Sequence, residues 1–201
     1  MNSHNILIDL LPTTVEIDDK EYAINSNFRV SMLFELLMQD KTLSDEEKLY
    51  RSLELYYPII PHNVDKAIKS ILWFYRCGKD IIKSKKIGKG KSVSSVYDFE
   101  YDDDYIYAAF LDQYKVDLQD IEYLHWWKFK AMFKALREDN EIVKIMGYRS
   151  MDLSKIKDKE QKAHYKELQE LYKIPISKNE QEKLDEINEA LKNGNDVSKI
   201  L

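Results

Sequence analysis

The segment Ile121–Leu136, "IEYLHWWKFKAMFKAL", places two tryptophans side by side in a run whose apolar spacing is that of an α-helix. Adjacent residues of a helix point about 100° apart. Trp126 and Trp127 therefore cannot both lie at the centre of one buried face. What covers the second indole decides how this part of the chain packs.

The pattern predicts one helix over residues 118–138 with two apolar faces. Its main face comprises Ile121, His125, Phe129, Met132, Phe133 and Leu136. Trp126 lies at the edge of this face, and Trp127 lies opposite it beside a thinner strip of Leu124, Ala131 and Ala135. Both faces need a cover, because a fully exposed indole forfeits about 3 kcal/mol. The cover is either a helix of the same chain or another protein. The residues that border the second face, and hence the candidate protein contacts, are Tyr123, Trp126, Trp127 and Lys130.

The composition favours a helical protein of a reducing compartment. The chain of 201 residues holds 5 glycines and 4 prolines, so few residues interrupt long helices. Its single cysteine, Cys77, cannot form an internal disulfide. A formal net charge of −5 argues against a general nucleic-acid binder. No run approaches the ~18 apolar residues of a membrane span, and the first residues lack the features of a signal peptide, so we expect a soluble intracellular protein.

Local signals predict the other elements and a mainly α fold class: a multi-helix bundle with a short N-terminal β-hairpin. The alternation of apolar and polar residues around Asp18–Lys20 predicts the hairpin. Ser44 and Glu47 form a capping box, and Gly78 stands where a left-handed C-cap is expected. The predicted helices lie at 27–39 after a cap at Ser26 or Asn27, 45–57, 64–77, 102–116, 140–147 with Gly147 as its end, 158–173, and from Ser177 onward.

Residues 79–95 differ from the rest of the chain because they carry six lysines against one aspartate, with glycines and serines between them. We predict a mobile basic linker here. It would join an N-terminal unit, 1–78, to a C-terminal helical unit, 96–201, although the two could also form one continuous domain. The acidic run that follows, residues 98–104, is interpreted as solvated surface charge.

No known catalytic, cofactor or metal motif is complete in the sequence. The run "IGKGKS" ends like a phosphate-binding loop, but the position of its first glycine holds Lys85. Four scattered histidines and one cysteine give no zinc spacing. We therefore expect no catalytic residues, no cofactor, no metal and no enzymatic activity.

Two stretches carry a family resemblance. The segment with the paired tryptophans, followed by "IVKIMGYRSMDLSKIKDKEQKAHYKELQELYKI" at 142–174, resembles the gene-product-fifteen family of tailed bacteriophages with long non-contractile tails. The opening "LIDLLPTTVEIDDKEYAINSNFRV", residues 7–30, is also similar to the start of that family. The resemblance covers nearly the whole chain and is least specific in the linker and the last helix.

The resemblance implies a tail-assembly chaperone, because the genes of this family lie next to the tape-measure gene. The implied partners are the tape-measure protein and other phage tail proteins, in the cytoplasm of the bacterial host and not in the mature virion. Two alternatives stay open: a structural tail or virion component, and a small binder of a host factor or nucleic acid through the basic linker. Self-association also stays open. We expect no membrane partner, and the acidic charge disfavours nucleic acid.

Overall fold

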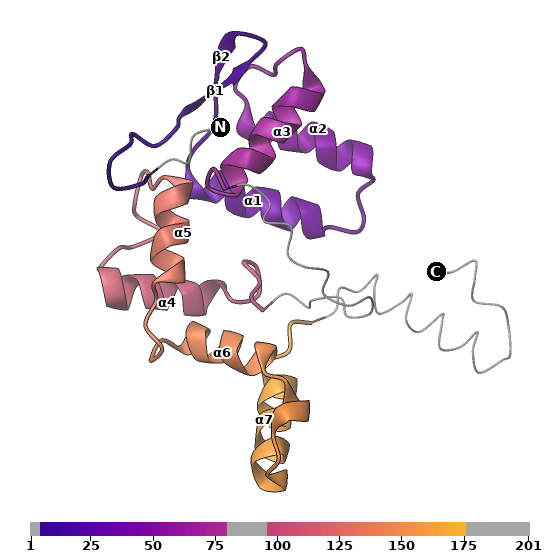
Figure 1. The fold of residues 1–201 in the computed structure, drawn as a ribbon, viewed down its shortest axis with the longest axis vertical. Helices are drawn as coiled ribbons and strands as arrows, with labels where there is room; N and C mark the ends of the chain where they lie inside the picture. Colours follow the sequence, from indigo (N-terminus) through magenta and orange to yellow (C-terminus); the bar gives the residue numbers. More distant parts are fainter. Residues whose placement is uncertain (1–4, 80–95, 176–201) are drawn as a thin grey trace, which may run out of the picture. The chain divides into compact units, whose positions relative to one another are not determined.

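The computed structural model describes residues 5–79 and 96–175 of the chain (Figure 1). These residues form seven α-helices, one short 3-10 helix and one two-stranded hairpin, which confirms the mainly α class. Contacts divide the chain into a unit of residues 1–152 and a unit of residues 153–201. The predicted linker beyond Lys79 and the predicted helix from Ser177 lie outside the described residues. The division into 1–78, 79–95 and 96–201 stays a prediction.

The N-terminal hairpin has the expected turn. Strand β1 (Thr14–Ile17) pairs antiparallel with β2 (Lys20–Ala23). Asp18 and Asp19 between them have φ of 53° and 58°, the positive values that a two-residue hairpin turn requires. The Asp18 carboxylate also accepts hydrogen bonds from Asn63 and Lys66, and the bond from Lys66 is the main reason that its pKa is lowered. The turn is therefore tied to the start of the third helix.

The first three helices form within two residues of their predicted bounds. Helix α1 (Phe28–Gln39) is capped by Asn27, α2 (Asp45–Tyr56) by the capping box of Ser44, and α3 (Val64–Tyr75) by Asn63. In each case the side chain of the cap accepts a hydrogen bond from a backbone N–H of the first turn. Helix α1 packs on α2, α2 packs on α3, and β1 packs on α3 (Figure 1).

Phe129 lies at the centre of the core that these helices share with α4 (Asp103–Tyr114), α5 (Trp126–Lys134) and α6 (Glu141–Ser150). Its ring is fully buried and is stacked with the rings of Phe28, Phe110 and Trp126 at centroid distances of 5.1, 4.8 and 5.7 Å. Helices α1, α4 and α5 thus meet at one aromatic column. Rings in offset contact stabilise a core beyond the area they bury.

The predicted helix over 118–138 is wrong in its bounds, since α5 spans only Trp126–Lys134. The Asp117 carboxylate accepts hydrogen bonds from the backbone N–H groups of Gln119 and Asp120, which fixes a turn there. The guanidinium of Arg29 donates to the carbonyls of Leu118, Gln119 and Ile121. The backbone groups that would continue a helix toward its N-terminus are therefore already bonded elsewhere.

The second apolar face of that helix is also absent. Ala131 and Ala135 are exposed, and Leu124 is buried in the extended segment before α5. His125 is the N-cap and not a member of a helical stripe. Helix α5 has one broad buried side, formed by Trp126, Trp127, Phe129 and Phe133.

Two further expectations are corrected around α6. Gly147 does not end the helix, which continues to Ser150. The acidic run is not wholly solvated, because the Asp102 side chain is completely buried. Asp102 can be buried because Arg149, beyond Gly147 in α6, forms a two-pronged ion pair with it at 2.6 and 2.9 Å.

The second unit is described from Leu153 to residue 175 and contains a 3-10 helix, Leu153–Lys155, and helix α7, Lys159–Leu171. Asp158 caps α7 by accepting from the backbone N–H of Gln161, and the helix begins one residue after its predicted start. Among the residues that the structure describes, no helix has the length and apolar character needed to cross a bilayer.

Candidate functional site

The paired indoles bind the C-terminal end of α3. Trp126 donates its indole hydrogen to the carbonyl of Tyr75 at 2.9 Å, and Trp127 donates to the carbonyl of Phe74 at 2.7 Å. The last four carbonyls of a helix have no partner inside it. Two adjacent tryptophans at the start of α5 therefore satisfy two adjacent carbonyls at the end of α3. The second indole, that of Trp127, is therefore covered by a helix of its own chain and not by another protein.

A tight turn after α3 makes room for Trp127. The N–H of Gly78 bonds to the carbonyl of Trp73 at 3.0 Å and that of Cys77 to Phe74 at 2.9 Å, the pairing of a Schellman motif. Cys77 and Gly78 have φ of 57° and 69°. A Cβ on Gly78 would lie 2.9 Å from Cη2 of Trp127, closer than packed atoms come. Gly78 thus serves both the left-handed turn and the close approach of the indole.

His125 holds the start of α5 through both ring nitrogens. Nδ1 accepts from the backbone N–H of Trp127 at 3.1 Å, and Nε2 lies 3.0 Å from the carbonyl oxygen of Pro12, to which it can only donate. Burial lowers the pKa of the imidazole. The ring is therefore neutral, with its hydrogen on Nε2. His125 is a cap, and both of its nitrogens are engaged in that role.

An antiparallel bridge joins the segments that precede α1 and α5. Asn27 pairs with His125, the N–H of Phe28 bonds to Leu124, and the N–H of Trp126 bonds to Ser26, both at 2.8 Å. Residues nearly 100 positions apart thereby fix where each helix begins. No local pattern of residues predicts this bridge.

The structure places the four predicted protein contacts in different surroundings. Trp126 and Trp127 are buried at 0% and 4% exposure in their own chain. Tyr123 is 52% exposed, although its hydroxyl lies 2.8 Å from that of Ser26. Lys130 is half-buried. Of the four side chains, that of Tyr123 is the most accessible to a partner.

Lys130 lies among three aromatic rings. Its ammonium nitrogen is 5.1 Å from the ring centre of Trp126, 5.7 Å from Tyr97 and 5.9 Å from Tyr75, and it donates to the Tyr97 hydroxyl at 3.3 Å. Tyr75 in turn donates to the carboxylate of Glu35. Burial, followed by the Glu35 carboxylate, raises the pKa of both tyrosines, so neither phenol ionises near neutral pH. Burial also raises the pKa of the nearby Cys77 thiol, which stays protonated.

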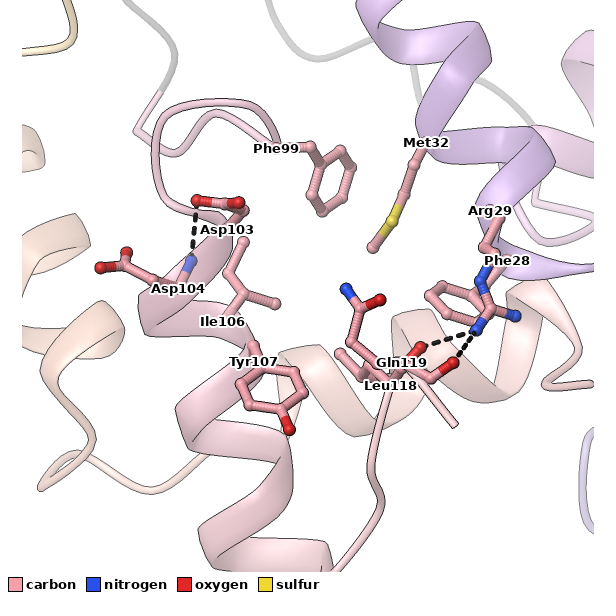
Figure 2. Close-up of a pocket in the computed structure, with 10 residues that line it drawn as sticks. All are labelled: Phe28, Arg29, Met32, Phe99, Asp103, Asp104, Ile106, Tyr107, Leu118 and Gln119. Carbon is pink, nitrogen blue, oxygen red and sulfur yellow. Dashed lines mark hydrogen bonds between the residues drawn. The ribbon is translucent and has the colours of Figure 1, made fainter. Parts of the chain in front are cut away.

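An open pocket of about 450 Å³ lies between α1 and the start of α4 (Figure 2). Apolar side chains form its walls, with Phe99, Met32 and Ile106 directed toward one another from three parts of the chain. Asp103 and Asp104 stand at one side of its mouth and Arg29 on the other. We call this the acidic pocket; its lining residues are Phe28, Arg29, Met32, Phe99, Asp103, Asp104, Ile106, Tyr107, Leu118 and Gln119.

The buried ion pair involves Asp102, which directly precedes the pocket residues Asp103 and Asp104 in the chain. Asp102, which carries one of the side chains with 0% exposure, also accepts from the backbone N–H of Asp98 at 2.9 Å. Arg149 donates to the carbonyl of Val96 at 3.2 Å as well as to Asp102. The pair therefore fixes the chain on both sides of the N-terminus of α4. Sequence reasoning missed it, because an aspartate among four other acidic residues carries no local mark of burial.

The most exposed apolar residues lie at the N-terminus, and sequence reasoning missed them too. Leu7, Ile8 and Leu10 are exposed at 90%, 80% and 94%. A turn holds this segment, since the N–H of Asp9 bonds to the carbonyl of Asn5 at 2.8 Å. A run of apolar residues in a sequence usually indicates a buried segment. The exposure of this run depends on the fold and could not be predicted from its residues alone.

Among the described residues, no three histidine, cysteine, aspartate or glutamate side chains are grouped so that they could hold a metal ion. The contacts described above join helices to one another, and the exposed parts of these residues form apolar and acidic surface. Such an arrangement can bind another polypeptide segment.

The comparisons with known proteins give one result. The model of the family described as Bacteriophage Gp15 protein matches residues 7–174. Neither the curated proteins nor the solved structures contain a match to the chain. The matched range includes the hairpin, all seven described helices and the paired tryptophans. The chain therefore belongs to the bacteriophage Gp15 protein family.

Proposed function

We propose that the protein is a non-enzymatic, chaperone-like factor of phage tail assembly, which binds the tape-measure protein and keeps it soluble until the tail tube forms. The family supplies the phage context. The observation that carries the proposal is the exposed apolar segment of Leu7, Ile8 and Leu10. Other tail proteins are secondary partners in this proposal.

Three large aliphatic side chains within four residues form an unusual surface for a protein with a well-filled core. Each such side chain gains about 1.5–3 kcal/mol when it is buried. Monomeric proteins rarely leave a contiguous apolar surface without a use for it. The segment leaves the body of the molecule at Pro12, whose carbonyl is bonded to His125. The segment is therefore anchored at its C-terminal end to the N-terminus of α5.

The expected partner has the matching chemistry. A tape-measure chain, as the family resemblance implies, is long and helical with apolar faces that aggregate before they are covered. Aliphatic side chains in a short segment can cover such a face without a precise register. Tyr123, Trp126, Trp127 and Lys130 stay proposed contacts. In the described conformation Tyr123 is available, whereas the two indoles act by holding α5 to α3.

Co-expression with the tape-measure protein tests the proposal. With this chain present, the tape-measure protein is expected in the supernatant; with Leu7→Ser, Ile8→Ser and Leu10→Ser combined, it is expected in the pellet. Ile59→Ser with Leu171→Ser is the matched control, because these residues are 75% and 70% exposed elsewhere. A tape-measure protein that is equally soluble without this chain would refute the proposal.

Two further measurements separate the alternatives. A factor that acts in the host cytoplasm should be missing from purified virions by mass spectrometry, whereas a structural tail component should be present. Binding of nucleic acid through the lysines of residues 79–95 should produce a mobility shift that disappears at about 0.15 M salt. Presence in virions would favour the structural tail component, and such a mobility shift would favour the nucleic-acid binder, over the chaperone-like role.

A further inference from the structure

We propose that the acidic pocket binds residues 80–95 of the same chain, with lysines of that segment facing Asp103 and Asp104. This inference does not rest on the proposed function. It gives a role to the two oppositely charged runs that adjoin in the sequence, residues 79–95 and 98–104.

The charges of the two sides are complementary. Asp103 and Asp104 are exposed in the first turn of α4, and Glu100 is exposed just before them. Arg29, on the opposite side of the pocket, already donates to three backbone carbonyls. Residues 80–95 contain five lysines and one aspartate. The mouth of the pocket therefore attracts cations, and the segment nearest to it in sequence is the most basic one in the chain.

The walls of the pocket suit the rest of the segment. Phe28, Met32, Phe99, Ile106 and Leu118 present apolar surface to the cavity. The segment carries Ile81, Ile82, Ile87 and Val93 among its lysines. A lysine also has a four-carbon stem that can lie along an apolar wall while its ammonium group stays at the mouth. The pocket can therefore accept an apolar side chain and an adjacent cation together.

The covalent connection keeps the segment at a higher local concentration near the pocket than a separate molecule would have. Val96, which directly follows the segment, is held by the bond from Arg149 to its carbonyl. Phe99 of the pocket wall is three residues further on, a span of at most about 10 Å. A segment joined this closely has an effective concentration on the order of millimolar at the pocket. Even a weak attraction then fills the site.

Limited trypsin digestion of the full chain tests one side of the contact. Lys83, Lys85, Lys86, Lys89 and Lys91 are cleavage sites that docking would protect. In Asp103→Asn/Asp104→Asn, cleavage at these lysines is expected to be at least about threefold faster, because the attraction of several pairs is lost. The control is Asp45→Asn/Glu46→Gln, which neutralises the exposed first turn of α2 and should leave the rate unchanged. Equal rates in all three proteins, or equal acceleration in both variants, would overturn the proposal.

Methyl NMR tests the other side. Met32 lines the pocket, whereas Met132 and Met146 lie elsewhere in the same unit. Replacement of the five lysines by glutamine should move the Met32 methyl signal and leave those of Met132 and Met146 in place. A rise to about 0.5 M salt should move it in the same direction, since exposed charge pairs are screened. A Met32 signal that ignores both changes and moves only when another protein is added would show that the pocket serves a partner, and would refute the proposal.

Discussion

Trp127 donates its indole hydrogen to the carbonyl oxygen of Phe74 at 2.7 Å, and the rings of the same two residues lie 5.9 Å apart. One side chain thus serves both as a cap for α3 and as part of its packing. Trp126 does the same at the next carbonyl, that of Tyr75. The joint between α3 and α5 therefore combines polar and apolar contacts in a single pair of residues, which makes its energetics testable by removing the polar part alone.

The two indole bonds should not contribute equally. Trp126→Phe leaves the Tyr75 carbonyl with only a weak contact from the Cys77 thiol, at 3.9 Å, and is expected to lower the free energy of unfolding by about 2–4 kcal/mol. Trp127→Phe leaves the Phe74 carbonyl bonded to the N–H of Cys77, so the expected loss is about 1–2 kcal/mol. Urea unfolding measures both values. A larger loss for Trp127→Phe would contradict this account of the joint.

The two described glycines, Gly78 after α3 and Gly147 within α6, should respond to alanine in opposite directions. Gly78→Ala is expected to destabilise the protein by about 1–3 kcal/mol, because the residue has φ of 69° and its new Cβ would meet Trp127 at 2.9 Å. Gly147→Ala should stabilise it by about 0.5–1 kcal/mol, since the position is helical and nothing lies within 4 Å of the added Cβ. Thermal unfolding of the two variants side by side provides the comparison. The same sign for both would be inconsistent with these surroundings.

The buried ion pair should behave unlike an exposed one. Arg149→Met leaves the carboxylate of Asp102 buried with no opposite charge and is expected to cost about 3–5 kcal/mol of unfolding free energy. Arg137→Met removes an ion pair with Asp112 in which both side chains are more than half exposed, so less than about 1 kcal/mol should be lost. Denaturant titration distinguishes them. Similar small losses would contradict the burial of this ion pair.

His125 should make stability depend on pH in a narrow range. Its pKa in the folded protein lies below the ordinary value of 6.5, because burial disfavours the charged ring. Above pH 6.5 the ring is neutral in both states and contributes its full stability. As the pH falls from 6.5 toward the lowered pKa, the unfolded state takes up a proton that the folded state does not, so stability decreases; below the lowered pKa the decrease stops.

The variant His125→Asn isolates this effect. Asparagine can cap a helix and does not titrate. The difference in unfolding free energy between the original protein and His125→Asn should be constant above pH 6.5 and should shrink as the pH falls below it. A difference that stays the same from pH 8 to pH 5 would show that the ring does not change its protonation on unfolding.

Local signals predicted most of the fold because they act within a few residues. Asn27 and Ser44 cap their helices through bonds that span two or three positions, and the turn at Asp18 and Asp19 needs only their own backbone angles. These features can be recognised without knowledge of the rest of the chain. The capped helices accordingly begin where the sequence indicated.

The parts that the sequence did not predict all depend on distant partners. Helical spacing before Trp126 suggested a longer α5, but Arg29 and Ser26, nearly 100 residues earlier, bind the backbone of that segment. Asp102 was interpreted as part of a solvated acidic run because its sequence neighbours do not reveal that Arg149 reaches it. The exposure of Leu7, Ile8 and Leu10 likewise depends on how the chain folds around them.

The carbonyl caps of α3 also determine when folding can be completed during synthesis. Phe74 and Tyr75 leave the ribosome about 50 residues before the indoles that bind them. Until Trp126 and Trp127 emerge, the end of α3 has to be hydrated and the aromatic rings beside it stay uncovered. In a nascent chain stopped in that interval the end of α3 would stay exposed, because its joint with α5 can form only after both tryptophans have been synthesised.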